Sequence, residues 1–272
     1  MKYSVLMSVY HRDDPEYLKQ ALESVYEHQT RKPDEIVVVF DGPLTDGLYD
    51  VLEHFREGKE QVVSYYPQEE NRGLGAALRV GSAHCTGDYI FRMDSDDISH
   101  PERFALQAAW VEKHPEVDVL GGNIAEFHNV PEEEHLRVRA CPPKHEDIAR
   151  MGRRRNPMNH VTVCIRRAAL EQCGYESLLL VEDYYLWLRM MAAGYKLANL
   201  DQTMVYVRVG NGFYNRRGAR TQIRSWKTLQ SFMVKHGMIG RADALMNMIY
   251  IVGFTCCPGE IRKFVYDKLL RR

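Results

Sequence analysis

The stretch Tyr89-Ile90-Phe91-Arg92-Met93-Asp94-Ser95-Asp96-Asp97 decides how this chain folds and where its chemistry lies. An apolar run is followed by three carboxylates within four residues, which is typical of a buried strand that presents acids at its C-terminal end. Ligands of open α/β sheets bind outside the carboxyl ends of the strands. Because like charges this close repel one another, a hard divalent cation with oxygen ligands is the simplest relief. The stretch therefore favours a site for a metal ion and a diphosphate.

A helix N-terminus is the alternative interpretation of the same acids. Asp97 or Ser99 could cap a helix that begins near Pro101, since Asp and Ser side chains accept hydrogen bonds from the first N–H groups of a helix. Acidic turns also occur where no metal binds. The stretch alone leaves both interpretations open.

Composition sets the outer limits. The chain is 45% hydrophobic and 27% charged, which is an ordinary globular composition. Its 272 residues permit one large α/β domain, or one domain with a helical extension. A net charge of −1 gives no reason to expect a nucleic-acid partner. The six Cys form no Cys-x-x-Cys pair, so we expect a reducing cytosol and no structural zinc site. The chain starts with strand-like sequence rather than a signal peptide, and its most apolar late run, Ala244–Cys257, is too short and too polar to span a bilayer.

Strand-like and helix-like runs alternate four times in the first half of the chain. This alternation predicts a parallel sheet with right-handed crossovers. The third predicted helix starts with the small residues Gly75, Ala76 and Ala77, which would allow close packing. The predicted strands are Tyr3–Val9, Glu35–Phe40, Val62–Tyr66 and Tyr89–Met93, and the predicted helices start after Pro15 and cover Leu48–Phe55, Gly73–Cys85 and Pro101–His114.

The second half is less regular. From Thr221 the pattern is helical to the end, with a break at Pro258-Gly259. The predicted strands of this half are Val117–Leu120, Val161–Ile165, Lys196–Leu200 and Val205–Val209, and one helix covers Asp183–Ala193.

The loop after the first strand argues against a backbone cradle for phosphates. It has the sequence Tyr10-His11-Arg12-Asp13-Asp14, where a dehydrogenase would need a glycine-rich turn. A Walker-type loop is also absent from the sequence. Any bound phosphates must therefore be held by a metal ion and by side chains.

Six short motifs, in this order, resemble those of the family 2 inverting glycosyltransferases, whose fold is the GT-A type. The resemblance implies a Rossmann-like mixed, mainly parallel α/β sheet flanked by helices, with a C-terminal helical extension. It implies a GT-A domain at 1–210, with a nucleotide-binding half at 1–100 and an acceptor half at 101–210, followed by a loop and helical extension at 211–272. The motifs are Ser8-Val9-Tyr10, Val38-Val39-Phe40-Asp41-Gly42, Asn71-Arg72-Gly73-Leu74-Gly75, Gly87-Asp88-Tyr89-Ile90, Asp94-Ser95-Asp96-Asp97 and Glu182-Asp183.

The resemblance assigns the nucleotide side of the site to four residues. Val9 and Tyr10 would contact the nucleoside, Asp41 would accept a hydrogen bond from a uracil N–H, and Arg72 would lie near the base and diphosphate. Asp41 could instead form an Asx turn, and Arg72 could be a solvated loop arginine. Gly42-Pro43 stands where the family usually has a serine, which weakens the detailed assignments there.

The same resemblance assigns the metal and the catalytic base. Asp96 would bind Mn²⁺ or Mg²⁺ directly, and Asp94 would contact the ribose or a metal-bound water. Asp97 could do either or cap the next helix. Asp183, with Glu182 in reserve, would remove the proton of the acceptor hydroxyl while one displacement inverts the anomeric configuration. The alternative is that both acids merely stabilise a helix N-terminus.

Further residues have two interpretations each. Tyr184 and Trp187 could stack on a sugar ring or pack in the core. His160 belongs to an Asn-Pro…His segment that resembles bacterial members that build surface polysaccharides, and it could contact the diphosphate or acceptor or be structural. Arg153–Arg155 could attract a lipid diphosphate or form a solvated face. Arg216 and its arginine neighbours Arg208, Arg217 and Arg220 flank a glycine-bearing loop, 210–218, that could close over the donor or lie free at the surface.

The expected function is transfer of a hexose, galactose or glucose, from a UDP-sugar to a saccharide acceptor carried on a polyprenyl diphosphate in O-antigen or capsule assembly. The basic and apolar tail, Ile261–Arg272, could lie on the inner face of the cell membrane, dock on its own domain or join two subunits of a homodimer. A sugar nucleotidyltransferase is a second hypothesis, although it should carry a glycine-rich, lysine-containing loop after the first strand. A non-catalytic nucleotide-sugar-binding protein is the third, although it would not need both acid pairs.

Overall fold

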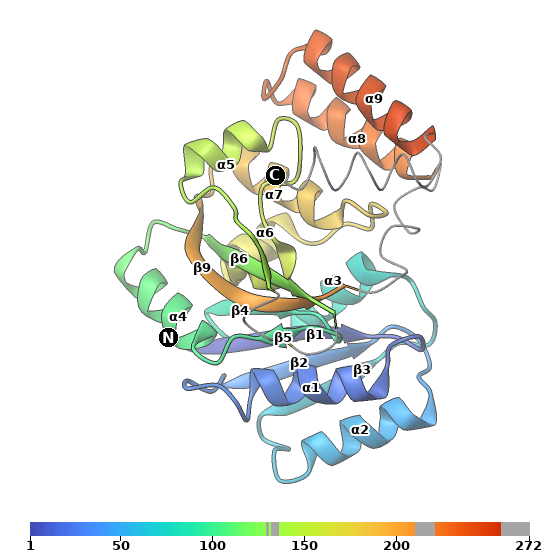
Figure 1. The fold of residues 1–272 in the computed structure, drawn as a ribbon, viewed down its shortest axis with the longest axis vertical. Helices are drawn as coiled ribbons and strands as arrows, with labels where there is room; N and C mark the ends of the chain where they lie inside the picture. The colour runs from blue at the N-terminus through green and yellow to red at the C-terminus, as the bar shows by residue number, and fades with distance from the viewer. Residues whose placement is uncertain (129–130, 132–135, 210–220, 257–272) are drawn as a thin grey trace.

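The computed structural model describes residues 1–128, 131, 136–209 and 221–256. These residues form a nine-stranded mixed sheet with helices on both faces (Figure 1). In order across the sheet, the strands are β3 (Val63–Pro67), β2 (Glu35–Phe40), β1 (Tyr3–Val9), β4 (Tyr89–Met93), β8 (Cys164–Arg166), β6 (Val119–Phe127), β9 (Leu197–Arg208) and β5 (Ile98–Ser99), with β7 (Arg137–Arg139) paired to β6.

The first half folds as the alternation predicts. The strands β3, β2, β1 and β4 pair in parallel, and each is followed in the chain by a helix or, after β4, by the acidic turn. The elements are β1 (Tyr3–Val9), α1 (Pro15–Val25), β2 (Glu35–Phe40), α2 (Asp46–Arg56), β3 (Val63–Pro67), α3 (Leu74–His84) and β4 (Tyr89–Met93).

The second half differs from the sequence prediction in several places. The strand predicted at 117–120 extends to Phe127, and the sequence analysis did not predict the strand Arg137–Arg139 or the helices His145–Met151 and Arg167–Cys173. The strands predicted at 196–200 and 205–209 are one strand, β9, which continues through the exposed Asp201-Gln202 with a shifted register against β6. The strand predicted at 161–165 begins instead as a turn of 3-10 helix, η2. The elements are β5 (Ile98–Ser99), α4 (Arg103–Lys113), β6 (Val119–Phe127), β7 (Arg137–Arg139), α5 (His145–Met151), η2 (His160–Thr162), β8 (Cys164–Arg166), α6 (Arg167–Cys173), α7 (Glu182–Ala192), β9 (Leu197–Arg208), α8 (Thr221–Lys235) and α9 (Arg241–Cys256).

Alternating side chains of the central strands separate two cores. Ile36 and Val38 of β2 face the core that contains α1, α2 and α4, whereas Val37 and Val39 face the core that contains α3, α5, α6 and α7. This alternation follows from the two-residue period of a strand. A sheet covered on both faces explains why its strands are almost continuously apolar.

Helix α3 lies close to the sheet because its facing residues are small. A Cβ atom on Gly81 would come within 2.3 Å of Leu6 Cδ1 and 2.7 Å of Val39 Cγ2. Only glycine fits at this position without movement of the two core side chains. The small residues predicted to allow close packing therefore extend along the helix.

A third apolar cluster attaches the C-terminal helices to the domain. Tyr184 and Leu188 of α7 pack against Trp226, Leu229 and Met233 of α8. Helix α9 then packs against α8 at one end of the molecule (Figure 1). Within the described residues, none of the helices is both long enough and apolar enough to cross a membrane.

Gly81→Ala should lower the free energy of unfolding by about 1–3 kcal/mol, because the added methyl group overpacks the contact between α3 and the sheet. Gly253→Ala is the matched control, since Gly253 is also helical but has no atom within 4 Å of the position that an added methyl group would take. That variant should be neutral or gain up to about 1 kcal/mol from helix propensity. Urea denaturation of both variants would contradict this packing if Gly81→Ala were as stable as Gly253→Ala.

Candidate active site

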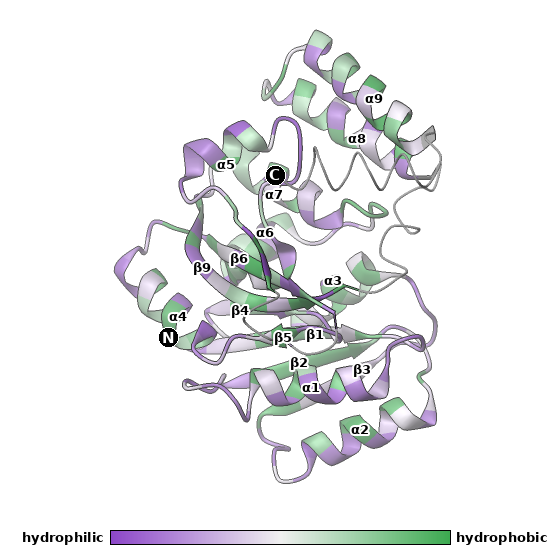
Figure 2. Cartoon of the chain, in the orientation of Figure 1, coloured by the Kyte–Doolittle hydropathy of each residue, from purple (hydrophilic) through white to green (hydrophobic). Residues whose placement is uncertain are grey.

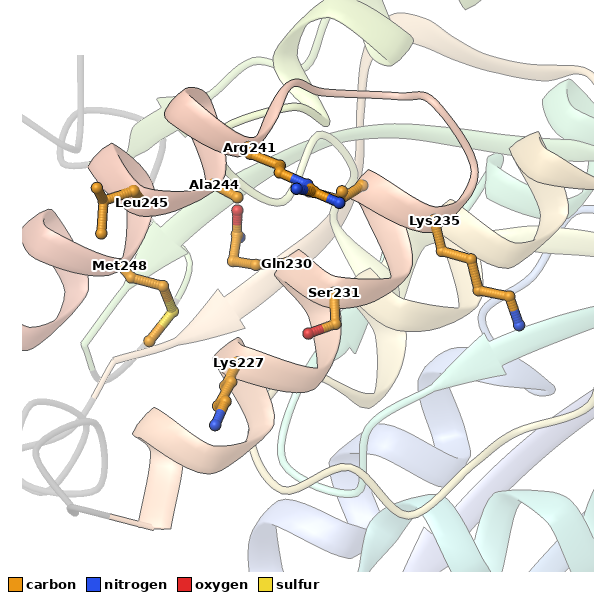
Figure 3. Close-up of a pocket in the computed structure, with 9 residues that line it drawn as sticks. Lys227, Gln230, Ser231, Lys235, Arg241, Ala244, Leu245 and Met248 are labelled. Carbon is orange, nitrogen blue, oxygen red and sulfur yellow. The ribbon is translucent and has the colours of Figure 1, made fainter.

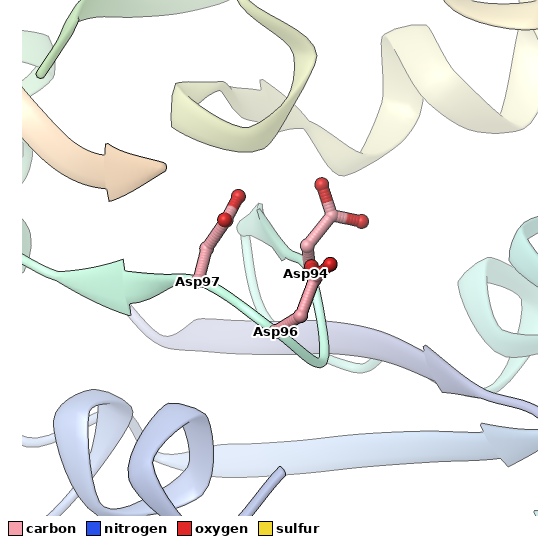
Figure 4. A group of neighbouring side chains, drawn as sticks. All are labelled: Asp94, Asp96 and Asp97. Atoms are coloured by element: carbon pink, nitrogen blue, oxygen red, sulfur yellow. The ribbon is translucent and has the colours of Figure 1, made fainter. Parts of the chain in front are cut away.

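Three carboxylates gather at the turn between β4 and β5. Oxygen atoms of Asp94, Asp96 and Asp97 all lie within 4.8 Å of one another (Figure 4). Asp96 is exposed, Asp94 is half-buried and Asp97 is 2% exposed. A cluster of oxygen donors that is open to solvent on one side suits Mg²⁺ or Mn²⁺, which keep positions for water and phosphate oxygens.

The helix-cap interpretation of this turn is wrong. Helix α4 begins at Arg103 after Glu102, and no side chain caps its first N–H groups. Asp97 instead accepts a hydrogen bond of 2.9 Å from the backbone N–H of Arg208 at the end of β9. Ser99 pairs through its backbone N–H with Ser24 Oγ in α1. The acidic turn is thus held by distant strands and helices rather than by the helix that follows it.

Two carboxylates of the turn, Asp96 and Asp97, have raised pKa values. Desolvation, with the charges of Asp94 and Asp13, raises the pKa of Asp96 to about 6, although its side chain is still open to solvent. Desolvation, with the charges of Asp96 and Asp94, raises the pKa of Asp97 well above its usual value. A bound cation would relieve this repulsion and favour the ionised carboxylates.

Asp13 is a member of the site that the sequence analysis missed. Its carboxylate Oδ2 accepts hydrogen bonds from Ser95 Oγ at 2.7 Å and from the backbone N–H of Tyr10 at 3.0 Å. It therefore joins the loop after β1 to the acidic turn. Its position directly after the first strand was visible in the sequence, but the contact with Ser95 is not local and has no motif.

Arg92 is a second residue that the sequence analysis missed. It lies on β4 only 3% exposed, inside the apolar run, and its guanidinium forms an ion pair with Asp94. Its Nε and Nη1 atoms are buried and have no hydrogen-bond partner among the described residues. A buried charge needs a counter-charge, so Arg92 and Asp94 hold each other in place at the base of the turn.

Asp41 fastens the loop that precedes α3. It is 4% exposed, and it accepts hydrogen bonds from the backbone N–H groups of Arg72 at 2.8 Å and Gly73 at 3.0 Å. An Asx turn is not formed, since Pro43 has no N–H to donate. The guanidinium of Arg72 is exposed and pairs with Glu70 at 2.8 Å, as expected for a solvated loop arginine.

Val9 and Tyr10 at the end of β1 differ in what they can present to a ligand. Val9 is fully buried in the core, and its carbonyl accepts a hydrogen bond from the Asp41 N–H at 2.8 Å. Tyr10 is half-buried and packs edge-on against His11. Of these two residues, only Tyr10 has a side chain positioned to reach a ligand at this edge of the sheet.

The second acid pair forms the first turn of α7, one residue past the capping position. Asp183 Oδ2 accepts a hydrogen bond of 2.6 Å from Asn156 Nδ2, and Oδ1 accepts one of 2.7 Å from the Tyr184 N–H. The residue at the capping position is Val181, so Asp183 does not act as the N-cap. Burial, with the charge of Asp183, raises the pKa of Glu182 even at this helix N-terminus.

The buried Tyr175 lies within electrostatic reach of one acid of each pair, Asp94 and Asp183. Burial raises the pKa of its hydroxyl; the charge of Arg92 lowers that pKa, and the charges of Asp183 and Asp94 raise it. A Cβ atom on Gly75 would lie 3.0 Å from Glu182 Cγ, so the start of α3 abuts the start of α7. The nucleotide side and the acceptor side expected from the sequence therefore meet in the fold.

Burial and hydrogen bonding decide between the two interpretations of Tyr184, Trp187 and His160. Trp187 and Tyr184 are at most 1% exposed, so core packing is confirmed and stacking on a sugar is wrong. A ring nitrogen of His160 lies 2.9 Å from the Tyr175 hydroxyl oxygen, and burial and the charge of Arg92 hold its pKa well below the usual value. His160 is therefore a neutral residue that supports Tyr175. Arg216, Arg217, Arg220 and the tail 261–272 lie outside the described residues.

Binding of Mn²⁺ should weaken as the pH falls, because protons compete for Asp96, whose pKa is about 6 without metal. The apparent affinity should drop about tenfold or more between pH 7 and pH 5. Asp96→Asn should weaken binding at pH 7, and Asp50→Asn, at an exposed carboxylate of α2, is the matched control. Electron paramagnetic resonance of free Mn²⁺ in the presence of UDP measures both effects, and pH-independent binding would contradict the assignment.

Two relatives match nearly the whole chain. The amylovoran biosynthesis glycosyltransferase AmsE of Erwinia amylovora is 36% identical over 98% of this chain and 98% of its own length. The UDP-Gal:alpha-D-GlcNAc-diphosphoundecaprenol beta-1,3-galactosyltransferase of Escherichia coli is 31% identical over 100% of this chain and 97% of its own length.

Solved structures share the architecture. S. aureus TarS 1–349 in complex with UDP-GlcNAc matches with a TM-score of 0.70 and 20% identity, over 99% of this chain and 76% of that one. GalNAc-T7 with UDP, GalNAc and Mn²⁺ matches with a TM-score of 0.69 and 17% identity, over 98% of this chain and 54% of that one. The fold is GT-A, as the sequence predicted. The model of the family described as Glycosyl transferase family 2 matches residues 4–174, and the chain therefore belongs to glycosyl transferase family 2.

Proposed function

We propose that this enzyme is an inverting, metal-dependent hexosyltransferase that moves a hexose from a UDP-sugar to a saccharide on a polyprenyl diphosphate. The chain has two carboxylate pairs, Asp94 with Asp96 and Glu182 with Asp183. The observation that carries the proposal is that one acid of each pair, Asp94 and Asp183, acts by its charge on the Tyr175 hydroxyl, while the start of α3 lies against Glu182. One pair suits a metal and its diphosphate, and the other suits a general base.

The relatives support the substrate classes. The Escherichia coli relative has a name that specifies UDP-Gal as donor and GlcNAc-diphosphoundecaprenol as acceptor, and the Erwinia relative is named for amylovoran biosynthesis. Both match this chain over nearly its full length. We infer that the donor is UDP-galactose, with UDP-glucose as the second choice, and that the product enters a bacterial surface polysaccharide. Such an enzyme would work at the cytoplasmic face of the membrane, where a lipid-linked acceptor is held.

On the donor side, the acidic turn would hold the diphosphate. A divalent ion held by Asp96 and Asp94 would stabilise, as a Lewis acid, the negative charge that grows on the leaving UDP. Arg92 keeps Asp94 in position, and the hydrogen bond from Ser95 to Asp13 ties the turn to the Tyr10 loop. Tyr10, Asp41 and the Arg72 loop would border the nucleoside.

On the acceptor side, Asp183 would act as the base. Asn156 donates to one carboxylate oxygen and fixes its direction. The acceptor oxygen attacks the anomeric carbon and its proton passes to Asp183, while the bond from that carbon to the phosphate oxygen breaks and UDP leaves with the electron pair. A single displacement of this kind inverts the anomeric configuration.

Asp183→Asn should lower turnover by about 10²–10⁴-fold, since general-base assistance is typically of that size. Donor binding should change little, because Asp183 lies on the acceptor side. Glu182→Gln is the matched control at the neighbouring carboxyl and should keep most of the activity. Measurement of UDP release and of UDP affinity for both variants separates the roles; full turnover in Asp183→Asn would remove it as the base.

A donor screen tests the proposed substrates. With Mn²⁺ and a GlcNAc-diphosphate lipid acceptor, UDP-galactose should release UDP fastest, followed by UDP-glucose. Asp96→Ala should reduce this release by about 10²-fold or more, because the leaving diphosphate loses its counter-charge. Release that is unchanged by metal removal, or release of diphosphate from a nucleoside triphosphate, would contradict the proposal.

A further inference from the structure

The outer face of α9 is apolar and uncovered among the described residues. Leu245 is 64% exposed and Tyr250 is 69% exposed, and Met246, Ile249 and Val252 are also exposed on the same helix. After Asp243 the helix carries no charged side chain as far as Cys256. Single exposed apolar residues are ordinary, but five on one helix form a patch of the kind that binds another surface. The hydropathy colouring of Figure 2 shows apolar residues recurring along α9.

A basic groove borders this patch. It lies between α8 and α9, has a volume of about 410 Å³, and is lined by Lys227, Lys235 and Arg241 together with polar and apolar residues (Figure 3). All three cations are exposed, and none of the groove-lining residues is acidic. Leu245 belongs both to the groove and to the exposed patch, so cations and apolar side chains adjoin.

The position of α9 relative to the active site is fixed by hydrogen bonds. Asn247 Nδ2 donates to Gln230 Oε1 of α8 and to the carbonyl of Arg153, both at 2.9 Å. The exposed run Arg153–Arg155 therefore starts against α9, and the next residue, Asn156, contacts the carboxylate of Asp183. Helix α9 is thus connected to Asp183 through the contact of Asn247 with Arg153 and that of Asn156 with Asp183.

We propose that the α8–α9 surface docks on an anionic lipid bilayer. The apolar face of α9 would enter the boundary between headgroups and acyl chains, and the groove cations would pair with lipid phosphates. A second copy related by a twofold axis would bring the same cations toward one another. The chain's own tail is also rich in cations, with Arg262, Lys263, Lys268, Arg271 and Arg272, so it would bring like charge to the groove. An anionic partner fits the groove better than either.

Vesicle flotation of the full-length protein tests this surface. Wild-type protein should float with vesicles of phosphatidylcholine and phosphatidylglycerol, and much less with phosphatidylcholine alone or at high salt. Lys227→Glu with Lys235→Glu should weaken vesicle affinity by about tenfold or more, since each basic residue near an anionic surface contributes to binding. Ile249→Ser with Tyr250→Ser should weaken it similarly, and the single variant Tyr250→Ser should give a smaller loss.

The matched controls are exposed residues elsewhere: Lys113→Glu at the end of α4 and Val138→Ser on β7. Both should bind vesicles as the wild type does, and UDP release to a soluble acceptor analogue should be unchanged in every variant. Vesicle binding equal to wild type in both double variants would overturn the proposal. Loss of a concentration-dependent dimer in those variants, with no vesicle binding by the wild type, would also overturn it and assign the surface to a second copy. Neither result depends on which sugar is transferred.

Discussion

Mutual repulsion among Asp94, Asp96 and Asp97 is the constraint around which the surrounding structure is arranged. Asp94, Ser95 and Asp97 of this turn are each held by a different residue of the chain. Arg92 of β4 pairs with Asp94, the N–H of Arg208 from β9 binds Asp97, and Ser95 donates to Asp13 after β1. These contacts keep three carboxylates within 4.8 Å although two of them have raised pKa values. A cation bound at this turn would reduce the repulsion among the carboxylates, which the contacts within the protein do not remove.

The sheet brings the rest of the site to the same edge. Parallel pairing of β1 with both β2 and β4 aligns the ends of these strands, so the Tyr10 loop, Asp41 and the acidic turn lie along one edge. Asp41 then fixes the loop that starts α3, and Gly75 of α3 lies against Glu182 of α7. The start of α3 therefore links Asp41, at the edge of the sheet, to the acid pair at the start of α7.

The elements with strong periodicity could be predicted from the sequence. The strands β1 to β4 alternate between two cores, and their apolar runs and turn residues mark their ends. The position of the acidic turn at the end of β4 was also predictable, but the stretch alone left open whether its acids bind a metal or cap the next helix. The strand β9 was divided in the prediction because Asp201 and Gln202 interrupt its apolar pattern, although the backbone pairing with β6 continues past them. The roles of Arg92, Asp13 and His160 depend on contacts between segments that are distant in the sequence. Local sequence patterns do not predict such contacts.

The metal assignment is tested most directly by diffraction from crystals grown with UDP and Mn²⁺, recorded at a wavelength where manganese scatters anomalously. The account predicts one strong anomalous peak in contact with the Asp96 carboxylate and with diphosphate oxygens of UDP. Ordered UDP with no peak at the acidic turn, or a peak bound only by residues elsewhere, would contradict the account.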